Sequence, residues 1–167
     1  MTLRLISGGD SPANPLDIVE QLVEANEWAF DRSSDDELAV EVTGRWCDFH
    51  LFFCWREELH ALHFSCLFDS RAPKSKMGDV AQLLALVNER LWLGHFDLSS
   101  EDGVTMFRHT VPMRGAPAAS VEMVEDLMDV AIGECERFYP AFQFVLWGGK
   151  SAEEAIAASM LDTVGEA

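Results

Sequence analysis

The segment 148–151 is the part of the chain that most resembles a phosphate-binding loop, because it reads Gly-Gly-Lys-Ser. The backbone N–H groups of such a glycine turn can cradle phosphate oxygens, and the lysine can neutralise them. The full pattern requires another glycine at position 144, where this chain has Phe144. A turn followed by a helix, with Ser151 and Glu154 as a capping box, explains the same residues. We therefore predict a capped helix here and no nucleotide site.

Histidines are the next candidates for chemistry, as metal ligands. His60 and His63 are three residues apart, and on a strand this odd separation directs them to opposite faces. His50, His63 and His109 could approach one another across a sheet, but we expect hydrogen bonds or solvent to satisfy them instead. The sequence therefore predicts no metal site.

Nucleophilic catalysis is not favoured either. No serine lies in a G-x-S-x-G elbow, and the cysteines fall in apolar segments without a CxxC motif, which indicates reduced core thiols. We predict a protein without catalytic residues and without a cofactor. An uncharacterised enzyme or small-ligand protein with a polar cleft remains the alternative. The four cysteines are Cys47, Cys54, Cys66 and Cys135.

Tryptophan is the most unusual part of the composition, with five Trp against one Tyr. Several of these indoles lie beside glycine turns or off the apolar stripes of the predicted elements. If two or more of them share one exposed surface with other apolar side chains, they form a patch of the kind found at protein interfaces. The candidate partner-binding residues are Trp46, Phe52, Leu86, Trp92, Leu93 and Trp147.

The elements that would position these residues follow from the hydrophobic periodicity. Alternation with a period of two over 28–69 indicates an antiparallel meander, and periods near 3.6 indicate helices. Pro140 should kink or end the third long helix, which leaves an apolar segment at 141–147. The predicted helices are 14–26, 77–93, a third that begins near 121 and a short one after 151, and a hairpin joins 95–98 to 104–113.

This order predicts an α+β fold, an antiparallel sheet with helices packed on one face. The element order is α-β-β-β(β)-α-β-β-α plus a C-terminal helical segment. We expect a flexible N-terminal tail at 1–13, one domain at 14–147 and a helical appendage at 148–167. Strict alternation allows one apolar face for the meander, with Phe49, Leu51, Phe53, Leu62, Phe64 and Phe68 in the core.

Charge narrows the range of partners. Twelve Lys and Arg against 29 Asp and Glu give a net charge of −17, which repels nucleic acid and anionic membranes. The N-terminus lacks the apolar region of a secretory signal, and no stretch approaches the length of a membrane span. We expect a cytoplasmic protein with no nucleic-acid or membrane partner.

The element order, together with the run 138–155 (Phe-Tyr-Pro-Ala-Phe-Gln-Phe-Val-Leu-Trp-Gly-Gly-Lys-Ser-Ala-Glu-Glu-Ala), resembles the bacterial YbjN family over about residues 14–147. That family carries the label of sensory transduction regulators. Its fold is similar to that of type III secretion chaperones, which bind partner proteins as dimers and have no active site. The resemblance implies a binding protein, and it transfers no catalytic or binding residue to this chain.

We therefore expect a non-enzymatic protein-binding module, chaperone-like or regulatory, that acts through an apolar surface. A structural self-assembling subunit is a further alternative. Leu86 and Leu93 lie about 100° or more away from the core stripe of helix 77–93, so we predict a homodimer through this helix or through 141–147. Alternatively, 141–147 folds back over the same surface within one chain.

Overall fold

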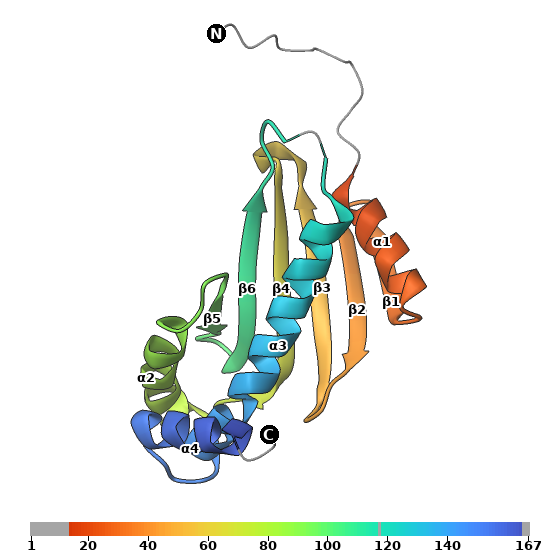
Figure 1. The fold of residues 1–167 in the computed structure, drawn as a ribbon. Helices are drawn as coiled ribbons and strands as arrows, with labels where there is room; N and C mark the ends of the chain where they lie inside the picture. Colours follow the sequence, from red (N-terminus) through yellow and green to blue (C-terminus); the bar gives the residue numbers. More distant parts are fainter. Residues whose placement is uncertain (1–13, 117, 165–167) are drawn as a thin grey trace, which may run out of the picture.

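The computed structural model describes residues 14–116 and 118–164, so the predicted tail at 1–13 lies outside the described residues. It is an α+β fold built on a six-stranded antiparallel sheet of order β1-β2-β3-β4-β6-β5 (Figure 1). The strands are β1 (Ala29–Ser34), β2 (Glu37–Thr43), β3 (Asp48–Arg56), β4 (Ala61–Arg71), β5 (His95–Leu98) and β6 (Val104–Pro112). The helices are α1 (Pro15–Ala25), α2 (Met77–Asn88), α3 (Val121–Leu146) and α4 (Ala152–Val164), with 3₁₀ turns at Glu57–Leu59 and Lys74–Lys76.

Alternation along the central strands divides the sheet into two different faces. On one face the side chains are buried and form the core beneath α1 and α3; in Figure 1, α3 lies across the central strands and α1 beside the β1–β2 edge. All six predicted core residues, from Phe49 to Phe68, lie on this face. The side chains between them point to the other face and are exposed or partly exposed. We call this second, uncovered side the open face.

Helix α1 begins as the sequence predicts. The Asn14 side chain accepts a hydrogen bond from the Leu16 N–H at 2.9 Å, and Pro15 occupies the first helical position. Burial of Leu16, Val19 and Val23 then holds the helix against β2 and β3.

Helix α2 ends at Asn88, so the prediction of a helix over 77–93 is wrong for its last five residues. The reason is a contact distant in sequence. The Phe96 N–H donates to Asn88 Oδ1 at 2.7 Å, and Asn88 Nδ2 donates to the Phe96 carbonyl at 3.1 Å. Asn88 thereby pairs with the backbone of the edge strand β5, and Trp92 and Leu93 lie in the connection between α2 and β5.

Helix α3 continues through Pro140 to Leu146, so the helix does not end at that proline and residues up to Leu146 belong to α3. Pro140 cannot donate a backbone hydrogen bond and costs a helix about 3 kcal/mol. Phe138 and Phe142, one on each side of it, are fully buried. Burial of each such side chain contributes about 1.5–3 kcal/mol, so burial outweighs the proline.

Helix α4 starts with the predicted capping box. The Ser151 N–H donates to Glu154 Oε2 at 2.9 Å, and the Glu154 N–H donates to Ser151 Oγ at 3.2 Å. The helix packs against α2 and α3 and buries Ala155 and Ile156. None of the described helices is long and apolar enough to span a membrane.

Candidate functional site

The six predicted partner-binding residues come from separate parts of the structure. Phe52 lies on the open face in β3 and is 45% exposed, whereas Trp92, in the α2–β5 connection, is 76% exposed and Trp147, at the end of α3, is 73% exposed. Leu86 and Leu93 are partly buried and pack against the chain's own core. Most of the apolar surface that the sequence assigns to helix 77–93 is therefore used within the protein.

Trp46, in the β2–β3 connection, is 46% exposed and also makes contacts within the protein. Its ring stacks on that of Tyr139 in α3, with centroids 6.4 Å apart and planes inclined by 9°. The Arg45 guanidinium lies 4.8 Å from the Trp46 ring centroid, and the Arg45 N–H donates to the Glu136 carboxylate at 2.8 Å. These contacts fasten the connection to α3.

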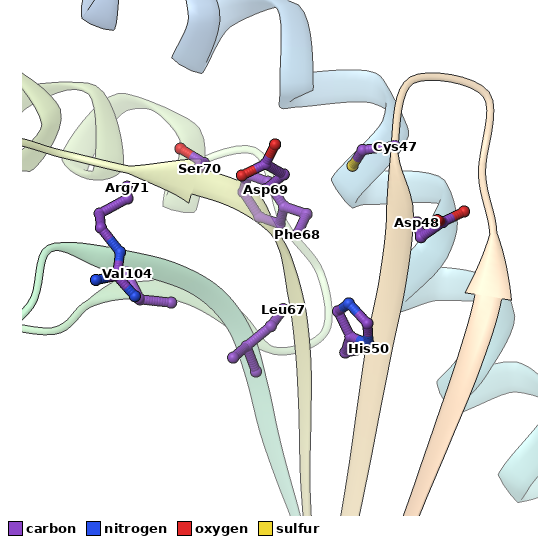
Figure 2. A pocket seen from close by; sticks show the side chains of 9 residues that line it. All are labelled: Cys47, Asp48, His50, Leu67, Phe68, Asp69, Ser70, Arg71 and Val104. Carbon is purple, nitrogen blue, oxygen red and sulfur yellow. The ribbon is translucent and has the colours of Figure 1, made fainter.

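The open face is hollowed where β4 extends beyond its partners. His50 of β3 lies opposite Leu67 of β4, and the β4–β6 pairing becomes irregular between Leu67 and Arg71. A hollow of about 530 Å³ opens at this irregularity, and we call it the β3–β6 hollow. Figure 2 shows the side chains of the residues that line it, among them His50, Leu67, Asp69, Arg71 and Val104.

Two further hollows adjoin this one. His50 also lines the β1–β3 hollow, of about 280 Å³, together with Asp31, Glu41 and Phe52. Arg71 also lines the Trp147 hollow, of about 460 Å³. The three hollows therefore meet at two shared side chains, and together we call them the groove.

Gly103 shapes the wall of the Trp147 hollow. Its φ is +72°, and a Cβ added there would lie 2.0 Å from the Ala72 carbonyl oxygen. The Ala72 N–H donates to the Gly103 carbonyl at 2.8 Å, which holds the two loops together. Only glycine fits this close approach with a positive φ.

Four carboxylates and one guanidinium, that of Arg71, line the first two hollows. Asp31 and Glu41 line the β1–β3 hollow, and Asp48 and Asp69 line the β3–β6 hollow. In the part of the chain that the structure describes, none of these four carboxylates is bridged to Lys or Arg. With Arg71 as the one Lys or Arg that lines them, the first two hollows keep an excess of negative charge next to apolar surface.

The thiol that lines the groove is not activated. Burial raises the pKa of the Cys47 thiol, and interaction with the Asp69 backbone opposes this only in part. A protonated thiol is a weak nucleophile. Cys47 is therefore suited to packing in this site.

The three histidines do not converge. His50 and His63 project to the open face, whereas His109 pairs with Phe64 on the helix-covered face, where burial lowers its pKa. Among the described residues, no group of three or more His, Cys, Asp or Glu could hold a metal ion.

Two of the six predicted partner-binding residues, Phe52 and Trp147, line the two outer hollows, and the sequence analysis did not single out the other residues of the groove. His50 and Arg71 join the hollows, yet each reads as an ordinary polar position in an alternating strand. The available signal was the long alternation of β4, which continues past Phe68. The sequence analysis also did not predict that two of the core thiols are neighbours, with Cys66 Sγ 3.7 Å from Cys135 Sγ.

Comparison with known proteins places the chain in a family. The family model described as "YbjN: Putative bacterial sensory transduction regulator" matches residues 15–144. A crystal structure of YbjN from E. coli, described as "a putative transcription regulator", has a similar fold, with a TM-score of 0.52 at 13% sequence identity. The similarity covers 81% of this chain and 93% of that one. No curated protein matches the chain. Because the family model spans most of its length, the chain belongs to the YbjN family.

Proposed function

We propose that this protein is a non-enzymatic regulatory module that binds another protein along the groove, two of whose three hollows lie on the open face. The observation that carries the proposal is the chain of three adjoining hollows, joined by His50 and Arg71. Exposed aromatic rings lie at both ends, with Phe52 in the first hollow and Trp147 in the last. Exposed aromatic side chains are enriched at protein interfaces.

The residues of the open face also depart from the pattern of a purely solvated sheet. In an antiparallel sheet with one solvent-exposed face, the residues on that face are mostly polar. Here Phe52, Leu67 and Met106 project to the open face from three neighbouring strands, and Leu67 lies opposite Met106. A row of apolar side chains across a solvent-exposed face is a feature of binding surfaces.

The comparisons support a regulatory role. The family is described as a "Putative bacterial sensory transduction regulator", and the E. coli protein of similar fold as "a putative transcription regulator". The likeness to type III secretion chaperones that the resemblance implies also fits a protein that binds other proteins. In this proposal the protein acts in the cytoplasm, where its charge of −17 favours partners that are not nucleic acids.

A small-ligand function is the second candidate, because the β3–β6 hollow has a volume of about 530 Å³. Pockets for small ligands have about 300–1,000 Å³. A ligand confined to this hollow would not require Phe52, which lines the neighbouring one. Binding that survives substitution of Phe52 would therefore favour this candidate.

Affinity capture from the native cell tests the proposal when wild type and two variants are compared. Phe52→Glu places a charge in the groove, and Leu59→Glu places the same charge on another exposed apolar side chain, between β3 and β4. We expect Phe52→Glu to lose a protein that both wild type and Leu59→Glu retain. Equal capture by all three proteins would contradict binding through the open face. Circular dichroism spectra and unfolding midpoints of both variants serve as the control for folding.

A further inference from the structure

The geometry and charge of the groove point to one kind of occupant: an extended segment of a basic partner, in which Lys or Arg side chains alternate with apolar ones. This inference rests on the proposed function and adds the chemistry of the partner. It concerns the first two hollows, which lie on the open face and share His50.

Charge complementarity is the first reason. Asp31 and Glu41 lie at one end of this stretch, and Asp48 and Asp69 lie at the other with Arg71, so the lining carries four carboxylates against one guanidinium. None of them is bridged to a cation within the described residues. A partner's ammonium or guanidinium groups would pair with them at short range, and a chain of net charge −17 would also attract such a partner from a distance.

The arrangement of the apolar side chains is the second reason. Phe52 lies in the first hollow and Leu67 in the second, and the acidic residues flank both. In an extended segment, successive side chains point to opposite sides, so apolar groups can enter the hollows while the basic groups between them reach the flanking carboxylates. A segment with long, flexible basic side chains suits this pattern because these reach sideways from the backbone.

The size of the face sets the length of the segment. The two hollows span the five neighbouring strands β1-β2-β3-β4-β6, which are separated by four gaps. With about 4.8 Å between neighbouring strands, this width is about 19 Å, which roughly six extended residues cross. A peptide of ten residues is therefore long enough to occupy both hollows and leave an end for a label.

A second copy of this chain fits the same face less well. Each copy carries a net charge of −17 and the same four carboxylates, so bringing two open faces together would oppose like charges. Like charges placed opposite each other across an interface disfavour that pairing.

The test uses three fluorescein-labelled ten-residue peptides in which Leu alternates with Lys, Gln or Glu. Fluorescence anisotropy should show the Lys peptide binding at least about tenfold more tightly than the Gln peptide, with no saturable binding of the Glu peptide. Equal affinity for the Lys and Gln peptides would overturn the inference.

A matched pair of double variants locates the binding. Asp31→Asn with Glu41→Gln removes two charges from the groove, and Glu125→Gln with Asp129→Asn removes two from the exposed surface of α3. We expect the groove pair to weaken Lys-peptide binding about tenfold and the α3 pair to change it less than twofold. If both double variants weakened Lys-peptide binding equally, the binding would depend only on the protein's net charge, and the inference would be overturned.

Failure of this inference is distinguishable from failure of the proposed function. If Phe52→Glu loses a protein partner in the capture experiment while the Lys and Gln peptides bind alike, the open face binds protein of other chemistry. If light scattering shows a dimer that Phe52→Glu converts to a monomer and Leu59→Glu does not, a second copy occupies the face. Either result would overturn the basic-segment inference.

Discussion

His50 lies opposite Leu67 across the β3–β4 pair, and this pairing joins the two hollows of the open face. The His50 side chain lines the β1–β3 hollow and the β3–β6 hollow, whereas Leu67 lines the second alone. Because both residues project away from the core, a substitution at either one changes the binding surface without opening a cavity beneath the helices. The function of the face can therefore be tested separately from the stability of the fold.

The core face supplies the first prediction. Phe64 is 1% exposed, and its ring lies 4.8 Å from that of Phe53 and 6.5 Å from that of Phe107. Phe64→Ala should lower the free energy of unfolding by about 3–5 kcal/mol, because it removes this packing and leaves a cavity. Urea denaturation measures the change. An unchanged midpoint would show that the register of the sheet is wrong.

Two glycines with positive φ allow a matched test of the loop that lines the Trp147 hollow. Gly103→Ala should destabilise the protein by clearly more than Gly115→Ala. Both replacements meet the strain of a positive φ, about 1–2 kcal/mol, but only the Gly103 Cβ would also meet the Ala72 carbonyl. The thermal unfolding midpoints of the two variants, each compared with wild type, measure the two losses of stability. Equal losses of stability would mean that residues 72 and 103 do not stay in close contact in solution.

The buried thiol pair predicts how stability depends on pH. Burial raises the pKa of Cys135 well above its ordinary value, and the nearby Cys66 raises it further. The native thiol therefore keeps its proton where the unfolded chain loses it, so its contribution is fully present below about pH 8.5 and is lost as the pH rises above that value.

Denaturation of wild type and Cys135→Ala between pH 7 and pH 10 measures this contribution. The wild type should lose more stability over that range than Cys135→Ala, although the variant starts from a lower value. Parallel curves for the two proteins would show that Cys135 does not contribute to the alkaline loss.

The homodimer expected from the sequence stays a prediction, and the structure changes the residue that tests it. Leu86 and Leu93 pack on the core, so Trp92 is the exposed apolar side chain that remains between α2 and β5. Light scattering coupled to size exclusion should show a dimer for wild type at micromolar concentration and a monomer for Trp92→Glu. Leu161→Glu, which alters another exposed side chain in α4, should remain dimeric. A monomeric wild type would refute the dimer.

Local patterns were sufficient to predict much of the fold. The register of β2, β3 and β4 follows from alternation, and the starts of α1 and α4 follow from caps made within four residues of sequence. The end of α2 was missed because Asn88 pairs with Phe96, eight residues later and in another element. The continuation of α3 was missed because the effect of Pro140 is outweighed by burial against distant strands.

The candidate site was harder to predict for the same reason. Phe52 and Trp147 stand out as exposed aromatic residues, but the hollows depend on where β4 and β6 lose their register, between Leu67 and Arg71. That irregularity belongs to a pair of strands and leaves no mark in the alternation of either one. His50 and Arg71 acquire their place in the groove only when three strands are assembled.

Site-specific photo-crosslinking in the native cell tests binding through the open face most directly. A photoreactive phenylalanine derivative at position 52 lies in the groove, and the same residue at position 59 lies outside it. The proposed function predicts a discrete covalent adduct with another protein from position 52 and none from position 59. Adducts of equal yield from both positions, or none from position 52, would contradict the proposal that this protein binds its partner on the open face.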